Sequence, residues 1–370
     1  MGIQVFDHLM TLTRGGNNRT KTIAYTEPNS ELFGIYLRGG HLWFKGTVHN
    51  GLKKYIDYCN QNAINLSISK ANVWAWARGG ASSTPMLYRY KNLADIALFA
   101  NVGQANVWQN ITAGATTSAI NLVPPHLRPD IVFQGLKNKK VGSAGKSNTV
   151  RVHQLVFHES GHYSHARRAG RLFWAKNFGA TIANGIGDPY SDGSQPSYQA
   201  GARIALVEGS GNFTEFKITN FYYNKSFYTS QNNLSAFFPA DAPGNTNSIE
   251  GYMENFDVYD RPMQDERRDD RSWFLHGLFW DLLDNRNEIS VGNFTFSQRL
   301  DGSGDFINNI NDNVNLPGSN DFDLSAIFNV LGSNTHDVCD LKNRLLNNNP
   351  TMINGLHQSF NSYGYCVPQL

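Results

Sequence analysis

The stretch VRVHQLVFHESGHYSHARRAG, residues 150–170, decides the fold. Its apolar residues recur every three or four positions, which predicts an amphipathic helix from Asn148 to about Ala169. Ser147 or Asn148 can cap the start of this helix, and Gly170 can end it. The helix follows a polar loop over residues 136–148 and a short apolar run, Ile131 to Phe133, that predicts a strand.

Within this helix stands the pattern H-E-x-x-H, formed by His158, Glu159 and His162. Residues four apart lie on the same face of a helix, so both imidazoles face one point. Neutral imidazole nitrogens are preferred zinc ligands, and a tetrahedral ion accepts two of them from one helical turn. Glu159 lies beside that face, where it can act as a general base on water. The stretch therefore predicts a Zn²⁺ site.

A catalytic zinc site also needs a third protein ligand. A second helix is predicted from Tyr198 to about Phe216, and Glu208 on it is flanked by apolar residues. A buried carboxylate is costly unless it is paired or bound to a metal, so Glu208 is the preferred third ligand. The alternatives are Glu250, which lies in a similar sequence context, and Asp188 or Asp192.

Two further histidines flank the pattern. His153 and His165 are expected to point away from the ion and to lie in solvent or beside a ligand. A metzincin would carry Gly at position 165 and His at position 168, whereas this sequence has His165 and Arg168, so that subclass is excluded.

Several pieces of the sequence together resemble a known family. They are Pro129-Asp130-Ile131, His158 to His162, Leu206-Val207-Glu208-Gly209, the run 278–284 (LFWDLLD), and the final segment 356–365. The chain resembles gluzincin metallopeptidases of the thermolysin-like and fungalysin-like kind, and more closely secreted or envelope zinc peptidases of bacteria. The resemblance implies an α+β, zincin-like fold. Residues 1–147 would supply a mixed sheet with one or two helices. Residues 148–370 would supply the catalytic helices and a helical C-terminal part, with one continuous catalytic unit from about residue 60 onward.

The resemblance to thermolysin also implies a downstream donor for the oxyanion. His276, on an apolar helix predicted from Arg271 to Leu283, is the first candidate, although a histidine in such a place can also be a satisfied core residue. Tyr252 and Tyr259 are rivals. Asp281 or Asp284 is expected either to orient a zinc-bound imidazole or to be a polar residue at a helix end.

The remaining elements are predicted from shorter patterns. Strands are expected over 3–6, 22–25, 33–37 and 64–76, and helices over 48–61, 324–331 and 351–362. The spacing from His162 to Glu208 is longer than in thermolysin-like enzymes, so the resemblance implies that residues 171–197 loop out as an insertion. Residues 218–250 are expected to be irregular. The resemblance to zincins also implies that the substrate backbone pairs with an edge strand, either 131–133 or 118–123.

The composition of the chain excludes some classes of binding partner. The formal net charge is +2 and charged residues make up 17%, which excludes the electrostatic footprint of a nucleic-acid or membrane-surface protein. No apolar run reaches the ~18 residues that span a bilayer. Three cysteines allow one bridge, Cys339 to Cys366, and the Asn-rich, Lys-poor composition favours export to the cell surface or envelope with a leader that is not in this chain. The oligomeric state stays open.

The sequence therefore predicts a zinc metallopeptidase, a hydrolase that acts on a peptide or protein substrate. His158, His162 and Glu208 would hold the metal, and Glu159 and His276 would be catalytic. Two alternatives remain open: a zincin-fold surface or binding protein without turnover, and a zinc hydrolase that does not act on peptides.

Overall fold

The computed structural model describes residues 4–6, 41–64, 71–75, 82–86, 128–133, 149–183, 198–223, 278–279, 282–283 and 324–362. The chain divides into two compact units. Unit 1 holds Met1–Gln61 and Leu66–Arg167, and unit 2 holds Asn62–Asn65 and Arg168–Leu370. The expected domain boundary after residue 147 lies outside the described residues.

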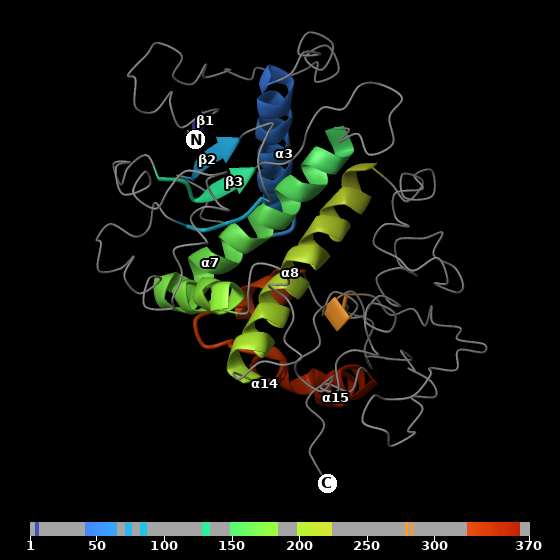
Figure 1. Cartoon of the computed structure of the whole chain (residues 1–370). Helices are drawn as coiled ribbons and strands as arrows, with labels where there is room; N and C mark the ends of the chain where they lie inside the picture. Colours follow the sequence, from blue (N-terminus) through green and yellow to red (C-terminus); the bar gives the residue numbers. More distant parts are fainter. Residues whose placement is uncertain are drawn as a thin grey trace, which may run out of the picture. The chain divides into compact units, whose positions relative to one another are not determined.

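Unit 1 contains a three-stranded parallel sheet in the order β1 (Gln4–Phe6), β2 (Asn72–Ala75) and β3 (Ile131–Phe133), shown in Figure 1. Val73 in β2 pairs with Val5 on one side and with Ile131 on the other. This confirms the strands predicted at 3–6 and 131–133. The strand predicted over 64–76 is shorter than expected, because Ile64 lies outside it. The strands predicted over 22–25 and 33–37 lie outside the described residues.

A buried carboxylate sets the register where β2 and β3 begin. Asp130 is fully buried, and its side-chain Oδ2 accepts a hydrogen bond of 3.0 Å from the backbone N–H of Asn72. The backbone N–H of Asp130 donates in turn to the carbonyl of Asn72 at 2.7 Å. The Asn72 side chain also donates to the carbonyl of Arg128 at 3.1 Å. Asp130 therefore satisfies backbone groups that would otherwise be buried without partners at the strand ends.

Next to β3 lies a short extended segment, residues 82–86. Ser83 and Val132 exchange two backbone hydrogen bonds of 2.9 and 2.8 Å in an antiparallel bridge, and the N–H of Met86 donates to the carbonyl of Asp130 at 3.0 Å. β3 is therefore covered on both sides, by β2 and by segment 82–86. β3 is the outermost strand in the sheet order, as predicted for 131–133, and the isolated bridge to Ser83 lies on its outer side. The pairing of a substrate with this strand stays a prediction, and the other candidate, 118–123, lies outside the described residues.

Helix α3 (His41–Gln61) packs in unit 1 with the first part of α7 (Thr149–Ala183). It begins at His41, earlier than the predicted start at 48. Its buried residues, Phe44, Val48, Leu52, Tyr55 and Cys59, follow helical spacing and form one face. The hydroxyls of Tyr55 and Ser164 lie 2.8 Å apart in the core, which ties α3 to the helix that carries the H-E-x-x-H pattern.

Gly51 sets how closely α3 approaches α7. A Cβ at this position would lie 3.0 Å from Cδ2 of His153 and 3.1 Å from Cβ of Val156, and both of these side chains are fully buried. We expect Gly51→Ala to lower the free energy of unfolding by roughly 1–2 kcal/mol, because the overpacking cost exceeds the gain in helix propensity. Urea denaturation would measure the change. Gly332→Ala is the control, since a Cβ there meets only the carbonyl oxygen of Val330 at 4.0 Å. A stabilised Gly51→Ala protein would contradict the expectation.

Helix α7 changes direction at Gly170, whose φ of 84° and ψ of 168° are not helical. A positive φ suits glycine because it lacks a Cβ. The helix predicted to end at Gly170 is therefore confirmed. The expectation that 171–197 loops out is wrong for 171–183, which is helical. Residues 184–197 lie outside the described residues.

In unit 2, helix α8 (Tyr198–Tyr223) begins where it was predicted and continues beyond Phe216. Residues 218–223, expected to be irregular, are its last turns. Phe213 of α8 packs against Phe279 and Phe328, with ring centroids 5.5 and 6.4 Å apart. The guanidinium of Arg203 lies 5.6 Å from the ring centre of Phe173. These aromatic contacts belong to the core of the described part of unit 2.

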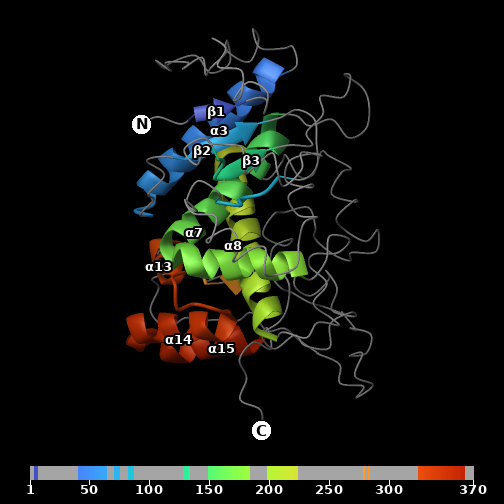
Figure 2. The ribbon, with the colours of Figure 1, turned by 60° about the vertical axis from the view of Figure 1, so that its left-hand side comes forward.

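The C-terminal helices are α13 (Leu324–Val330), α14 (Val338–Asn348), the 3-10 turn η4 (Pro350–Met352) and α15 (Ile353–Ser362). Figure 2 shows α14 and α15 side by side. The helices predicted over 324–331 and 351–362 are confirmed, whereas α14 was missed. Its signal was present in the sequence, because Val338, Leu341 and Leu345 recur at helical spacing and all three are buried.

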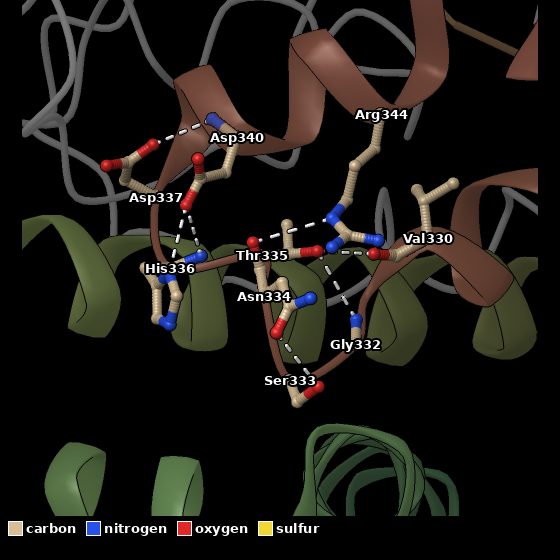
Figure 3. Close-up of polar contacts among 9 residues, drawn as sticks. All are labelled: Val330, Gly332, Ser333, Asn334, Thr335, His336, Asp337, Asp340 and Arg344. Carbon is tan, nitrogen blue, oxygen red and sulfur yellow. Dashed lines mark hydrogen bonds and ion pairs between the residues drawn. The ribbon is translucent and has the colours of Figure 1, made fainter. Parts of the chain in front are cut away.

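The turn between α13 and α14 is closed by its own polar groups (Figure 3). The Thr335 hydroxyl donates to the carbonyl of Val330 and ends α13. The Asp337 side chain caps α14 by accepting a 2.8 Å hydrogen bond from the N–H of Asp340. Such a cap satisfies a backbone donor that has no partner in the first helical turn.

In the described residues, the state of the cysteines and the hydropathy of the helices match what was expected from the sequence. Cys339 is disulfide-bonded and Cys59 is a buried cysteine outside any disulfide, while Cys366, the partner expected for Cys339, lies outside the described residues. Among the described helices, none is both long and apolar enough to cross a membrane.

Candidate metal centre

The two histidines of the pattern lie one helical turn apart on α7. The ring centroids of His158 and His162 are 4.5 Å apart, and the ring planes are nearly perpendicular, at 84°. His162 is buried and His158 is partly exposed. The neighbouring Val152, Val156 and Tyr163 are fully buried, so packing fixes the face on which the imidazoles lie.

His158, His162 and Glu208 form a group that could hold a metal ion. Their candidate ligand atoms all lie within 4.8 Å of one another. Glu208 comes from α8, where it is partly exposed between the buried residues Val207 and Gly209. Two imidazole nitrogens and one carboxylate oxygen form a donor set that suits a catalytic zinc ion with one open position.

Several predicted site residues lie outside the described part of the chain. They include the alternative ligands Glu250, Asp188 and Asp192, the oxyanion candidates His276, Tyr252 and Tyr259, and the orienting candidates Asp281 and Asp284. The described group of three contains neither His153 nor His165.

His153 and His165 do not lie in solvent, so the first of the two alternatives expected for them is wrong, while a place beside a metal ligand stays a prediction. His153 is fully buried and His165 is 1% exposed. Burial, with a smaller contribution from the positive charge of Lys54, lowers the pKa of His153 from 6.5 to about 3. His153 is therefore a neutral core residue near neutral pH.

This buried imidazole makes stability depend on pH. Between pH 6.5 and about 3 the unfolded chain binds a proton at His153 that the folded protein does not bind. Stability contributed by His153 is therefore lost as pH falls through this window, by up to about 1.4 kcal/mol per pH unit, and is constant above it. We expect His153→Gln to flatten this part of the stability curve, measured by urea denaturation at several pH values. His357→Gln, at an exposed position, is the control. Equal slopes for His153→Gln and the parent would refute this assignment.

The side chain of Glu159 is held by a residue from segment 82–86. Glu159 and Thr84 are each 4% exposed. The Thr84 hydroxyl lies 2.7 Å from the Oε2 atom of Glu159 and 2.9 Å from the carbonyl oxygen of the same residue. Thr84 was not among the predicted site residues, because a threonine 75 positions away from its partner belongs to no local motif.

The arrangement brings together three candidate metal ligands and a buried carboxylate. Glu159 directly follows His158 in α7, so a buried carboxylate lies on the same helical turn as the two imidazoles. Such a set can bind a divalent ion and accept a proton from water near it. Comparisons with protein-family models, with curated proteins and with solved structures found no match to this chain.

Proposed function

We propose that this chain is a zinc-dependent metallopeptidase with an α+β, zincin-like fold. His158, His162 and Glu208 would hold the ion, and Glu159 would act as the general base. The observation that carries the proposal is the grouping of three candidate ligand atoms within 4.8 Å of one another, next in sequence to a buried carboxylate.

The donor set and Glu159 together favour zinc. A set of two histidines and one carboxylate also occurs in iron oxygenases. A glutamate directly after the first histidine is the arrangement used for metal-assisted hydrolysis. When bound, zinc would polarise the carbonyl of the substrate and lower the pKa of water.

The protein's own residues supply the proton transfers. The Glu159 carboxylate accepts a proton from the attacking water, whose oxygen bonds to the carbonyl carbon of the peptide. Glu159 then gives that proton to the nitrogen of the leaving amine as the C–N bond breaks. One water is consumed, and the products are a carboxylic acid and an amine.

Among the described residues of unit 1, segment 82–86 is suited to align a peptide. Ser83 directs its N–H and C=O toward Val132 of β3. Adjacent residues of an extended chain direct these groups to opposite sides, so those of Thr84 point away from β3. An extended substrate that pairs there would lie beside the residue that contacts Glu159.

The disulfide at Cys339 supports a location outside the cytosol. Disulfides form and persist mainly in oxidising compartments. A secreted or cell-envelope enzyme of bacterial type is therefore the proposed setting, with peptides or proteins as substrates.

Metal content and hydrolysis test the proposal together. The purified chain would be analysed for bound metals, stripped with a chelator, reloaded with Zn²⁺ or Fe²⁺, and incubated with a peptide library whose products are read by mass spectrometry. We expect about one zinc per chain and cleavage that is lost on stripping and restored by zinc. Stoichiometric zinc without cleavage would indicate a binding protein, and cleavage confined to non-peptide esters or amides would indicate another hydrolase. Either result, or activity restored only by iron, overturns the peptidase assignment.

A further inference from the structure

We propose that Thr84 is a positioning residue that holds the Glu159 carboxylate where the reaction needs it, an inference that rests on the function proposed above. The Thr84 Oγ1 atom is within hydrogen-bond distance of two oxygens of one residue, Oε2 at 2.7 Å and the carbonyl oxygen at 2.9 Å. The hydroxyl therefore links the side chain of Glu159 to the main chain of its own helix. This link opposes rotation of the carboxylate about its side-chain bonds.

The hydroxyl is itself held in place by its neighbours along the chain. On one side, Ser83 is anchored to β3 by two backbone hydrogen bonds with Val132. On the other side, Pro85 restricts the backbone of Thr84 to the extended region. Threonine is branched at Cβ, so few side-chain conformations remain for it. Little conformational entropy is therefore left to lose when its hydroxyl binds the carboxylate.

Burial strengthens this contact. Thr84 and Glu159 are each 4% exposed, so water competes little for either partner. A hydrogen bond to a charged acceptor is stronger than one between neutral groups, and more so away from water.

A hydroxyl can also serve Glu159 before and after proton transfer. It carries one hydrogen and two lone pairs. It can donate to the carboxylate while Glu159 is charged. Once Glu159 carries the proton, the hydroxyl can accept from the carboxyl group and donate to the carbonyl oxygen. The base thus keeps a partner at the same place throughout the reaction.

Two substitutions of Thr84 distinguish a role in positioning Glu159 from a role in packing alone. Thr84→Val keeps the shape of the side chain and removes the hydroxyl, whereas Thr84→Ser keeps the hydroxyl. We expect Thr84→Val to lower kcat by about 10- to 100-fold with KM and bound zinc little changed, because the base is then misplaced by a small distance. Thr84→Ser should recover most of the rate. In a Glu159→Gln background, Thr84→Val should cause no further loss. Ser83→Ala, which removes the neighbouring hydroxyl, is the matched control and should behave as the parent.

A second measurement does not depend on activity. Crystal structures of the zinc-loaded Thr84→Val and Thr84→Ser proteins should show the Glu159 side chain displaced or in several rotamers in the first and unchanged in the second. An unchanged Glu159 side chain in Thr84→Val, or full kcat in that variant when the parent is active, overturns the role of Thr84. Absence of hydrolysis by the parent instead overturns the proposed function, and the crystal structures still decide whether Thr84 holds the carboxylate.

Discussion

Replacing Glu159 by glutamine is expected to lower kcat for peptide hydrolysis by about 10²- to 10⁴-fold, the range that a positioned general base contributes. The amide keeps the size of the side chain and can still accept a hydrogen bond from Thr84, so the fold and the contact described above should persist. What is lost is a group able to take a proton from water and pass it to the leaving amine.

Steady-state kinetics on a peptide identified in the library would measure this change. Zinc content and the urea denaturation midpoint of Glu159→Gln should equal those of the parent, which shows that the loss lies in proton transfer. A variant that cleaves the same peptide as fast as the parent would falsify the mechanism.

Replacing Glu208 by glutamine is expected to weaken zinc binding by at least about 100-fold, because even residues that only orient ligands change affinity by about 10- to 100-fold. The neutral amide oxygen removes the negative charge from the group formed with His158 and His162. Competition with a chromophoric chelator would measure the affinity, and hydrolysis at limiting zinc should fall in proportion.

The matched control is Glu215→Gln, the same substitution two helical turns further along α8, at a buried residue outside the metal group. Its zinc affinity should equal that of the parent. If Glu208→Gln bound zinc as tightly as Glu215→Gln, Glu208 would not be the third ligand. The alternative ligands Glu250, Asp188 and Asp192, which lie outside the described residues, would then be tested in the same way.

The parts of unit 1 that were predictable are those with short-range signals. The helix from residue 149 to Gly170 follows from apolar spacing and from a glycine at its end, and the structure shows both. β3 follows from three consecutive apolar residues, all buried. The pairing of β3 was not predictable from the same run, because β-strand partners come from distant parts of the chain.

Two helices of unit 2 differ from their predictions. Helix α14 was missed although its buried residues have helical spacing, since no element was predicted between residues 331 and 351. Helix α8 was predicted to end early because residues 218–250 show no clear periodicity and are rich in Asn, Ser, Tyr and Phe. Tertiary packing overrides such weak local preferences.

Residues close together in sequence were therefore enough to place His158, Glu159 and His162 on one helical turn, because helix geometry depends only on spacing. Their surroundings depended on the folded chain. The grouping with Glu208, the burial of His153 and the contact between Thr84 and Glu159 each join residues from separate elements. Such contacts result from the packing of whole helices and strands, which no local pattern encodes.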